Sequence, residues 1–563
     1  MLGLAAASAA VAQVPPAVAP GLDQLRRPQD IPLLEPETRP APQAPAITVP
    51  VPQIAPTAPT LSQGARVLAR AFRFTGNTVV PETELQAIAA PFLGRELSNA
   101  DLDDLRVRIT RHYVDAGYIN SGAVIPDQDV TGGVITFQIV EGRLSEIVVG
   151  GNNRFRPGYL SERLALGAGP VLNVNRLQER MQLLLQDPQI ERIAGELAPG
   201  TQPGEAVLRA DVTGASPFIA GFTLSNERSP VVGADQAEVF FGTRNLLGYG
   251  EALTLRAATT SGLDDYSAAM TVPLTASGTL LQARYQRTYS RVVEAPFDQL
   301  DIAARSRSWE LGLSHPLVAH PQYSLTASAL LANRSTRSFF LGQPSPFVPG
   351  APDGHTTVTA LRFGLEWVDR TAERVVAART LLSHGLKAFG ATIGDGFPDS
   401  NFTALLAQLQ WVRQAFSGAG LWVVRAEAQI ADSPLLGPEK YSIGGIDSVR
   451  GYRKDLLVRD NGWFGSIEYR HTVAHLPMRE RAGAGEGPLR LALFADLGQA
   501  RDNSSTNPGQ SFLASIGPGL RWEPAPGFEL QAYWGFALRD STTPTRTSQD
   551  HGLHVRIGFV KPF

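Results

Sequence analysis

The sequence predicts α+β modules followed by an all-β transmembrane barrel, and three observations support this fold class. Only 18% of the 563 residues are charged, whereas about 25% is usual in soluble domains. Residues 66–214 combine short strands with helical periodicity, but residues 215–563 show short alternating segments instead. No run of about 18 apolar residues occurs, so a closed β-barrel is the expected way of crossing a membrane.

The composition argues against several classes of function. A net charge of -3 is not typical of a dedicated nucleic-acid binder, so we expect no nucleic-acid partner. The absence of cysteine excludes disulfides, thiolate metal sites and cysteine nucleophiles. The nine histidines show no zinc-binding spacing, and no nucleophile elbow is visible. We therefore expect no enzyme activity, no catalytic residue, no metal site and no cofactor.

The N-terminal segment predicts export followed by a linker. Residues 1–12 are small and apolar, and Ala10-Val11-Ala12 fits a signal-peptidase site, which predicts a signal-peptide remnant. The basic region expected before it is missing, so either the true start lies upstream or residues 1–12 are a disordered tail. Residues 13–65 are predicted to be a proline-rich linker, with 13 prolines between Pro15 and Pro59.

Residues 66–143 are predicted to form a first α+β unit. A short strand at 72–74 ends at a Gly-Asn turn, and an apolar stripe then predicts a helix around 85–92. Ser98 and Asp101 form a capping box for a second helix that ends near Gly117. Two strands, at 118–125 and 134–140, complete a β-α-α-β-β order.

Residues 144–214 repeat this pattern as a second unit. We expect a strand at 147–149, helices near 159–166 and around 177–185, and a closing strand at 206–212. Helices on one face of a small sheet leave the sheet edge available, and extended peptides bind such edges by strand addition. The alternative is that the two units are rigid spacers.

Residues 215–563 are predicted to form the barrel. Apolar and polar residues alternate over 422–430, 489–497, 528–538 and 553–559. A period of two over about 10 residues, with one apolar and one charged face, is typical of outer-membrane strands. A soluble β-sandwich also alternates, but its strands are shorter.

Two stretches are more specific than this alternation. Residues 444–452 read GGIDSVRGY and residues 494–498 read FADLG. The first resembles the lumen loop, and the second the partner strand, of outer-membrane proteins of the POTRA-barrel superfamily, where POTRA means polypeptide-transport-associated. The motif residues are Gly444, Gly445, Val449, Arg450, Gly451 and Tyr452 in the loop, and Phe494, Asp496 and Gly498 in the strand. The resemblance implies that Arg450 pairs with Asp496 in the lumen, and the alternation independently places Asp496 on the polar face.

Two such units after a proline-rich linker resemble the transporter half of two-partner secretion, the TpsB type of the hemolysin-activator and filamentous-hemagglutinin proteins. This resemblance implies two POTRA domains in the periplasm of a Gram-negative cell and a sixteen-stranded barrel in the outer membrane. The implied partners are a secreted TpsA-type protein that is unfolded in transit, outer-membrane lipid, and the barrel-assembly machinery for insertion. An N-terminal helix that plugs the lumen is also implied, and the candidate is 21–27, with Leu22, Leu25 and Arg26.

Other functions remain open at this point. A barrel-assembly factor, which inserts other outer-membrane proteins, shares the loop and strand motifs, although more POTRA units and no plugging linker would favour it. A nutrient receptor needs a large globular plug, and the proline-rich linker is too short and too polar to supply one.

Overall fold

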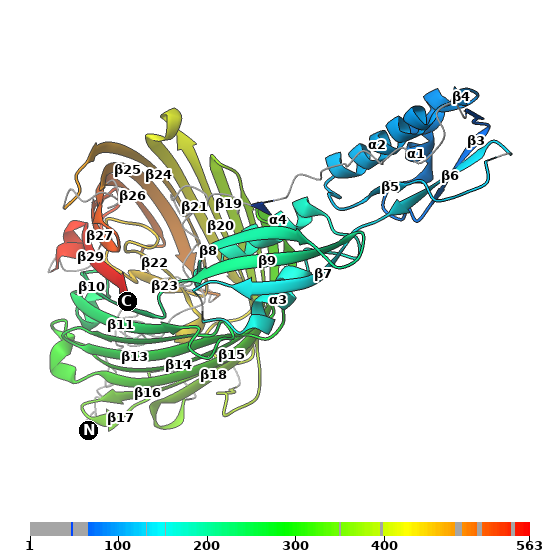
Figure 1. Cartoon of the computed structure of the whole chain (residues 1–563). Helices are drawn as coiled ribbons and strands as arrows, with labels where there is room; N and C mark the ends of the chain where they lie inside the picture. The colour runs from blue at the N-terminus through cyan, green and yellow to red at the C-terminus, as the bar shows by residue number, and fades with distance from the viewer. Residues whose placement is uncertain are drawn as a thin grey trace, which may run out of the picture.

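The computed structural model describes residues 47–48, 66–130, 132–152, 154–347, 351–394, 398–478, 487–503, 509–541 and 547–563. The predicted signal segment and the helix candidate at 21–27 lie outside these ranges. In the described ranges, no helix combines the length and apolar character needed to cross a membrane. A large barrel carries the second α+β unit against one end, and the first unit projects away from it (Figure 1).

The first unit contains the predicted strand, two helices and two strands in that order, together with the short strands β2 and β4, which the sequence pattern did not predict. Its main sheet has the order β3-β6-β5, with β3 parallel to β6, and a two-stranded sheet joins β2 to β4. The bounds are β2 (Val67–Leu68), β3 (Ala71–Thr75), α1 (Glu82–Ala89), β4 (Glu96–Leu97), α2 (Asn99–Asp115), β5 (Gly122–Val124) and β6 (Val134–Val140). The capping box of Ser98 and Asp101 is present. The strand predicted at 118–125 is shorter, because Ser121 donates to Tyr118 in a turn.

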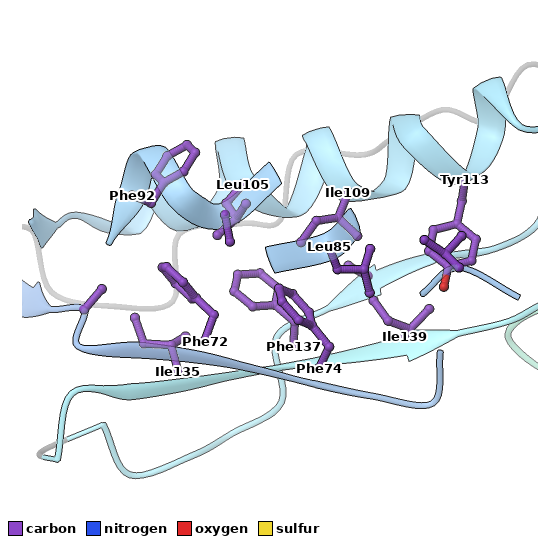
Figure 2. Close-up of a cluster of buried hydrophobic side chains, with 14 of the residues drawn as sticks. Phe72, Phe74, Leu85, Phe92, Leu105, Ile109, Tyr113, Ile135, Phe137 and Ile139 are labelled. Carbon is purple, nitrogen blue, oxygen red and sulfur yellow. The ribbon is translucent and has the colours of Figure 1, made fainter. Parts of the chain in front are cut away.

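Apolar side chains hold the helices of this unit on one face of its sheet (Figure 2). The rings of Phe72 and Phe74 lie 6.2 and 6.0 Å from that of Phe137, and the α2 residues Leu105 and Ile109 are fully buried above them. Burying each such side chain stabilises a fold by roughly 1.5–3 kcal/mol. The unit therefore has a core of its own.

The second unit contains β7 (Arg143–Gly150), α3 (Pro157–Ala165), α4 (Val174–Leu185), β8 (Ile190–Pro199) and β9 (Glu205–Gly214). Its sheet has the order β1-β8-β9-β7, so the linker strand β1 (Ile47–Thr48) adds to the β8 edge. The sequence pattern did not predict β8 as a strand. A register shift between Ile190 and Arg192 interrupts its alternation, which resumes at Ile193.

Side chains of the second unit bind the barrel turns nearest to it. Arg163 and Arg180 donate to the carbonyl oxygens of Thr275 and Ala276 at 2.9 and 2.8 Å. Gln189 donates to the carbonyl oxygen of Gly250 at 2.8 Å. These hydrogen bonds, two of them from charged arginine donors, fix this unit at one mouth of the barrel.

The barrel closes by antiparallel pairing of its first and last strands, and Phe222 lies opposite Phe559 at this seam. The described residues form sixteen long strands, which confirms the expected number, and β17 (Gln343–Pro344) and β28 (Phe536–Ala537) are short additions. The long strands are β10 (Phe218–Ser225), β11 (Gln236–Arg244), β12 (Ala252–Thr259), β13 (Leu263–Pro273), β14 (Leu280–Arg291), β15 (Ala303–Ala319), β16 (Tyr323–Phe340), β18 (His355–Arg370), β19 (Arg374–Gly385), β20 (Thr403–Ala415), β21 (Gly420–Ala431), β24 (Asn461–His475), β25 (Pro488–Arg501), β26 (Phe512–Ala525), β27 (Phe528–Trp534) and β29 (Leu553–Pro562).

The two faces of the barrel wall differ as the alternation predicts. On β18, Phe363, Leu365 and Trp367 are 42–50% exposed on the outside, whereas Arg362 is 2% exposed. On β25, Leu491 and Leu493 are exposed, whereas Asp496 is 2% exposed. An apolar outside around a polar inside is the arrangement of a membrane barrel.

Candidate functional site

The connection between β21 and β24 packs against the inner wall of the barrel. Within it, β22 (Tyr441–Ile443) and β23 (Leu457–Arg459) pair as a hairpin, and residues 444–456 lie between these strands. The loop residues Val449 and Tyr452 belong to one buried apolar cluster with the wall residues Phe464 and Leu513. We call residues 432–460 the lumen loop.

Glycines allow the lumen loop to approach the wall closely. Gly451 has φ +87°, which favours glycine, and a Cβ there would lie 3.0 Å from the carbonyl carbon of Gly535. A Cβ on Gly535 would lie 2.4 Å from the Gly451 nitrogen, so the two backbones touch. On β25, Gly498 leaves space for Val449, whose Cγ2 would lie 3.2 Å from a Cβ at that position. Gly535 lies outside both motifs and was not predicted.

Arg450 joins the lumen loop to Asp496 on β25, as the resemblance implies. Its Nε donates to Asp496 Oδ2 at 2.7 Å and its Nη2 to Oδ1 at 2.8 Å, and its backbone N–H also donates to Oδ2 at 3.0 Å. Arg450 is 1% exposed and Asp496 is 2% exposed. A bidentate pair between a guanidinium and a carboxylate fixes orientation as well as distance.

Further wall residues complete the pocket of Arg450. Its Nη1 donates to Glu468, and its Nη2 donates to Ser466 Oγ at 3.0 Å. Its guanidinium carbon lies 3.7 Å from the centre of the Phe494 ring. The Tyr533 hydroxyl donates to Glu468 at 2.8 Å. Phe494 belongs to the FADLG motif, whereas Ser466, Glu468 and Tyr533 lie outside both motifs and were not predicted.

The strand register carries a signal that points to two of the missed residues. Ser466 and Glu468 on β24 lie opposite Asp496 and Phe494 on β25. All four side chains therefore lie on the same face of the β24–β25 strand pair. A strand predicted at 461–475, paired with β25, would place Ser466 and Glu468 beside the FADLG motif.

A second charged cluster holds the start of the lumen loop against another part of the wall. Glu439 lies two residues before the start of β22. Its Oε1 accepts a hydrogen bond from Arg362 Nη2 on β18 at 2.7 Å. Arg334 Nη1 on β16 lies 3.8 Å from Glu439 Oε1. Arg334 Nη2 donates to Glu310 Oε1 on β15 at 3.2 Å. The side chains of Arg334, Arg362 and Glu439 are 2–3% exposed. The loop is thus held at two separate places on the wall.

The lumen beside the loop contains a cavity of about 870 Å³ with a polar lining. Charges of both signs project into it from strands and loop, including Arg256, Glu238, Arg425, Glu427 and Lys454. Among the described residues, no group of three His, Cys, Asp or Glu side chains is placed to hold a metal ion. Small-molecule sites are lined mainly by apolar side chains, whereas charged side chains of both signs line this cavity.

Comparison with known proteins identifies the family. The model for the haemolysin secretion/activation protein ShlB/FhaC/HecB matches residues 204–522, which is more than half of the chain. The chain belongs to this haemolysin secretion/activation family. A model for the ShlB-type POTRA domain matches residues 67–142. The chain is therefore an outer-membrane transporter of two-partner secretion, with POTRA structure in the periplasm and a secreted partner protein.

Individual relatives agree with this assignment. The outer membrane transporter CdiB of Dickeya dadantii is 23% identical over 439 residues, which cover 74% of each chain. The heme/hemopexin transporter protein HuxB of Haemophilus influenzae is 21% identical and covers 81% of this chain and 80% of its own. The structure of CdiB from Escherichia coli superposes with a TM-score of 0.69 at 21% identity, covering 90% of this chain and 93% of its own. These matches give less support to the barrel-assembly alternative.

Proposed function

We propose that an unfolded partner protein passes through the barrel lumen and that the lumen loop, locked by Arg450, controls this path. The observation that carries the proposal is the buried fork from Arg450 to Asp496 beside a polar cavity. In this proposal Gly444, Gly445, Val449, Gly451 and Tyr452 seat the loop, and Phe494 and Gly498 form its receiving surface. The POTRA units, at 66–143 and 144–214, capture the partner in the periplasm.

The remaining partners follow from the barrel surface. Exposed apolar side chains such as Leu365 and Leu493 would contact outer-membrane lipid. A closed barrel with a polar lumen also has to be inserted, and we propose that the cell's barrel-assembly machinery does this. The chain itself is proposed to act without catalytic residues or cofactors.

Reconstitution tests this function. The purified chain is placed in lipid vesicles, and an unfolded fragment of the exported partner is added on the POTRA side. We expect the fragment to become protected from protease inside the vesicles, and protection to fall sharply with the Asp496→Ala variant. Integration of an added barrel protein into the vesicle membrane, without protection of the fragment, would instead support an assembly factor.

A further inference from the structure

Arg453, the residue after the GGIDSVRGY motif, contacts two strand connections at the end of the barrel away from the POTRA units. Its Nε and Nη2 donate to Asp550 Oδ1 and Oδ2 at 2.7 and 2.8 Å. Its Nη1 donates to both carboxylate oxygens of Glu294 at 2.9 and 3.1 Å. The three side chains are only 4–12% exposed. One buried guanidinium thus joins two carboxylates from different connections.

The positions of these carboxylates place the contact at the outer mouth. Glu294 lies between β14 and β15, and Asp550 lies in a short helical turn (Ser548–His551) before β29. Antiparallel strands put these connections at the end opposite the turns at 275 and 276, which bind the second POTRA unit. Arg453 therefore lies on the side where a secreted chain leaves.

Neighbouring contacts extend this cluster to the connection after β10. Gln549 accepts from the Lys454 backbone N–H at 2.8 Å and donates to the carbonyl oxygens of Asn226 and of Arg228, the latter at 2.6 Å. Val231 and Val232 of the same connection pack with Val292 and Ile302 in one apolar cluster. These three connections thus pack together as one group, which we call the outer layer, and Arg453 and Lys454 of the lumen loop bind to it.

We propose that Arg453, Glu294 and Asp550 form a latch that closes the outer mouth of the lumen and opens when a chain leaves. Glu294 and Asp550 lie on separate connections, so removing the guanidinium leaves two facing carboxylates that repel each other. The latch joins the outer layer to the lumen loop, so opening also loosens the loop from outside. The inference rests on export through the lumen.

A reversible crosslink tests the latch, because the chain has no cysteine of its own. Glu294→Cys and Asp550→Cys are combined in one variant. A short thiol-reactive crosslinker with an internal disulfide, which reductant cleaves, can join the two cysteines because both native side chains contact the same guanidinium. The uncrosslinked variant should show higher channel conductance in planar bilayers than the parent chain. The crosslinked variant should lose both the added conductance and secretion, and reductant should restore them.

The matched control joins Asp369→Cys and Arg374→Cys, an exposed pair at 2.6 Å beside a turn at the POTRA end. Its crosslink should leave secretion and conductance unchanged. Full secretion by the crosslinked Glu294→Cys/Asp550→Cys variant would overturn the latch. Failure of the parent chain to secrete would contradict the proposed export through the lumen. The conductance comparison would still decide whether the latch closes the outer mouth. Arg453→Ala, checked for heat-modifiable gel mobility, should also raise conductance.

Discussion

A guanidinium has five N–H donors, and a buried Arg450 needs partners for them inside the barrel. Asp496 and Glu468 supply the charge, Ser466 adds a hydroxyl acceptor, and Phe494 covers one face of the guanidinium plane. Lysine has neither the planar fork nor this number of donors, so the pocket is specific for arginine.

We expect Arg450→Ala or Asp496→Ala to abolish most secretion while the barrel still inserts. Removing one partner of a buried ion pair costs about 3–5 kcal/mol, because the other charge stays behind unpaired, and this is enough to release the loop. Secretion of the partner into the medium is measured, and heat-modifiable gel mobility reports the folded barrel.

Arg490→Ala is the matched control for these variants, because Arg490 on β25 pairs with Glu523 on the neighbouring wall strand β26 at 2.7 Å. It should secrete almost normally. Normal secretion by both Arg450→Ala and Asp496→Ala would show that their pair has only a structural role.

Sequence comparison could identify Arg450 and Asp496 because both lie in short continuous motifs. It could not identify the partners of Arg453, which lie 97 and 159 residues away in connections without any motif. Gly535 was missed for a related reason, since its importance comes from a backbone approach to Gly451 that no local pattern records.

Glu141, at the end of β6 in the first POTRA unit, shows how one carboxylate connects several elements. Its Oε1 accepts from the backbone N–H groups of Thr78 and Val79 at 2.7 and 3.0 Å and from the Tyr113 hydroxyl of α2 at 3.1 Å. The Thr78 hydroxyl also donates to Oε2. Burial raises the pKa of Glu141, but the hydrogen bonds from this hydroxyl, the two backbone N–H groups and Tyr113 together outweigh burial and hold its pKa below the ordinary value of 4.5.

A lowered folded-state pKa stabilises the unit above the unfolded-state pKa, and this contribution disappears as the pH falls through the folded-state value. We therefore expect Glu141→Gln to lower the Tm of a fragment spanning residues 66–213 at pH 7, and to have much less effect well below pH 4.5. Each unit of this fragment has its own core. Thermal unfolding against pH checks this, with the exposed Glu146→Gln as control. An equal loss of Tm at every pH would contradict it.

The second POTRA sheet was expected to have a free edge for strand addition, but its β8 edge is partly covered. Ile47 and Thr48 of the linker pair in parallel with Gly195 and Glu196, so this edge is partly occupied by the chain's own backbone. Strand addition by an exported partner at these residues has to replace β1.

We predict that the fragment 66–213 binds an unfolded piece of the partner with a Kd of micromolar order, about -8 kcal/mol. A fragment that also contains Ile47 and Thr48 should bind more weakly, because β1 competes for β8. Isothermal titration compares the two fragments. Equal affinities would remove β8 as the shared edge, and no detectable binding by either would favour the spacer interpretation.

At the element scale, periodicity predicted the helices of the two POTRA units and several of their strands because each buries one regular face. It failed at β8, where a shifted register hides the alternation, and at β5, where turn hydrogen bonds shorten the strand. The barrel strands were predictable in kind, but their number followed from the family resemblance rather than from alternation.

For the whole molecule, the lumen loop, the latch and the plug candidate are all proposed to act on the same path, the barrel lumen. The plug helix at 21–27 stays a prediction, since it lies outside the described residues. We expect deletion of residues 13–30 to raise single-channel conductance in planar bilayers without abolishing secretion. Conductance equal to that of the full chain would mean that this segment does not obstruct the pore.

Passage through the lumen is the central claim, and two neighbouring residues of β20 test it directly. Gln410 is 3% exposed and lines the lumen cavity, whereas Leu409 is 42% exposed on the outer face. A partner fused to a tightly folded domain is stalled during secretion, and a photocrosslinker is attached at Gln410→Cys or Leu409→Cys. The account predicts adducts with the stalled partner from position 410 and none from position 409. Adducts from 409 alone, or none from 410 while the partner remains stalled, would contradict it.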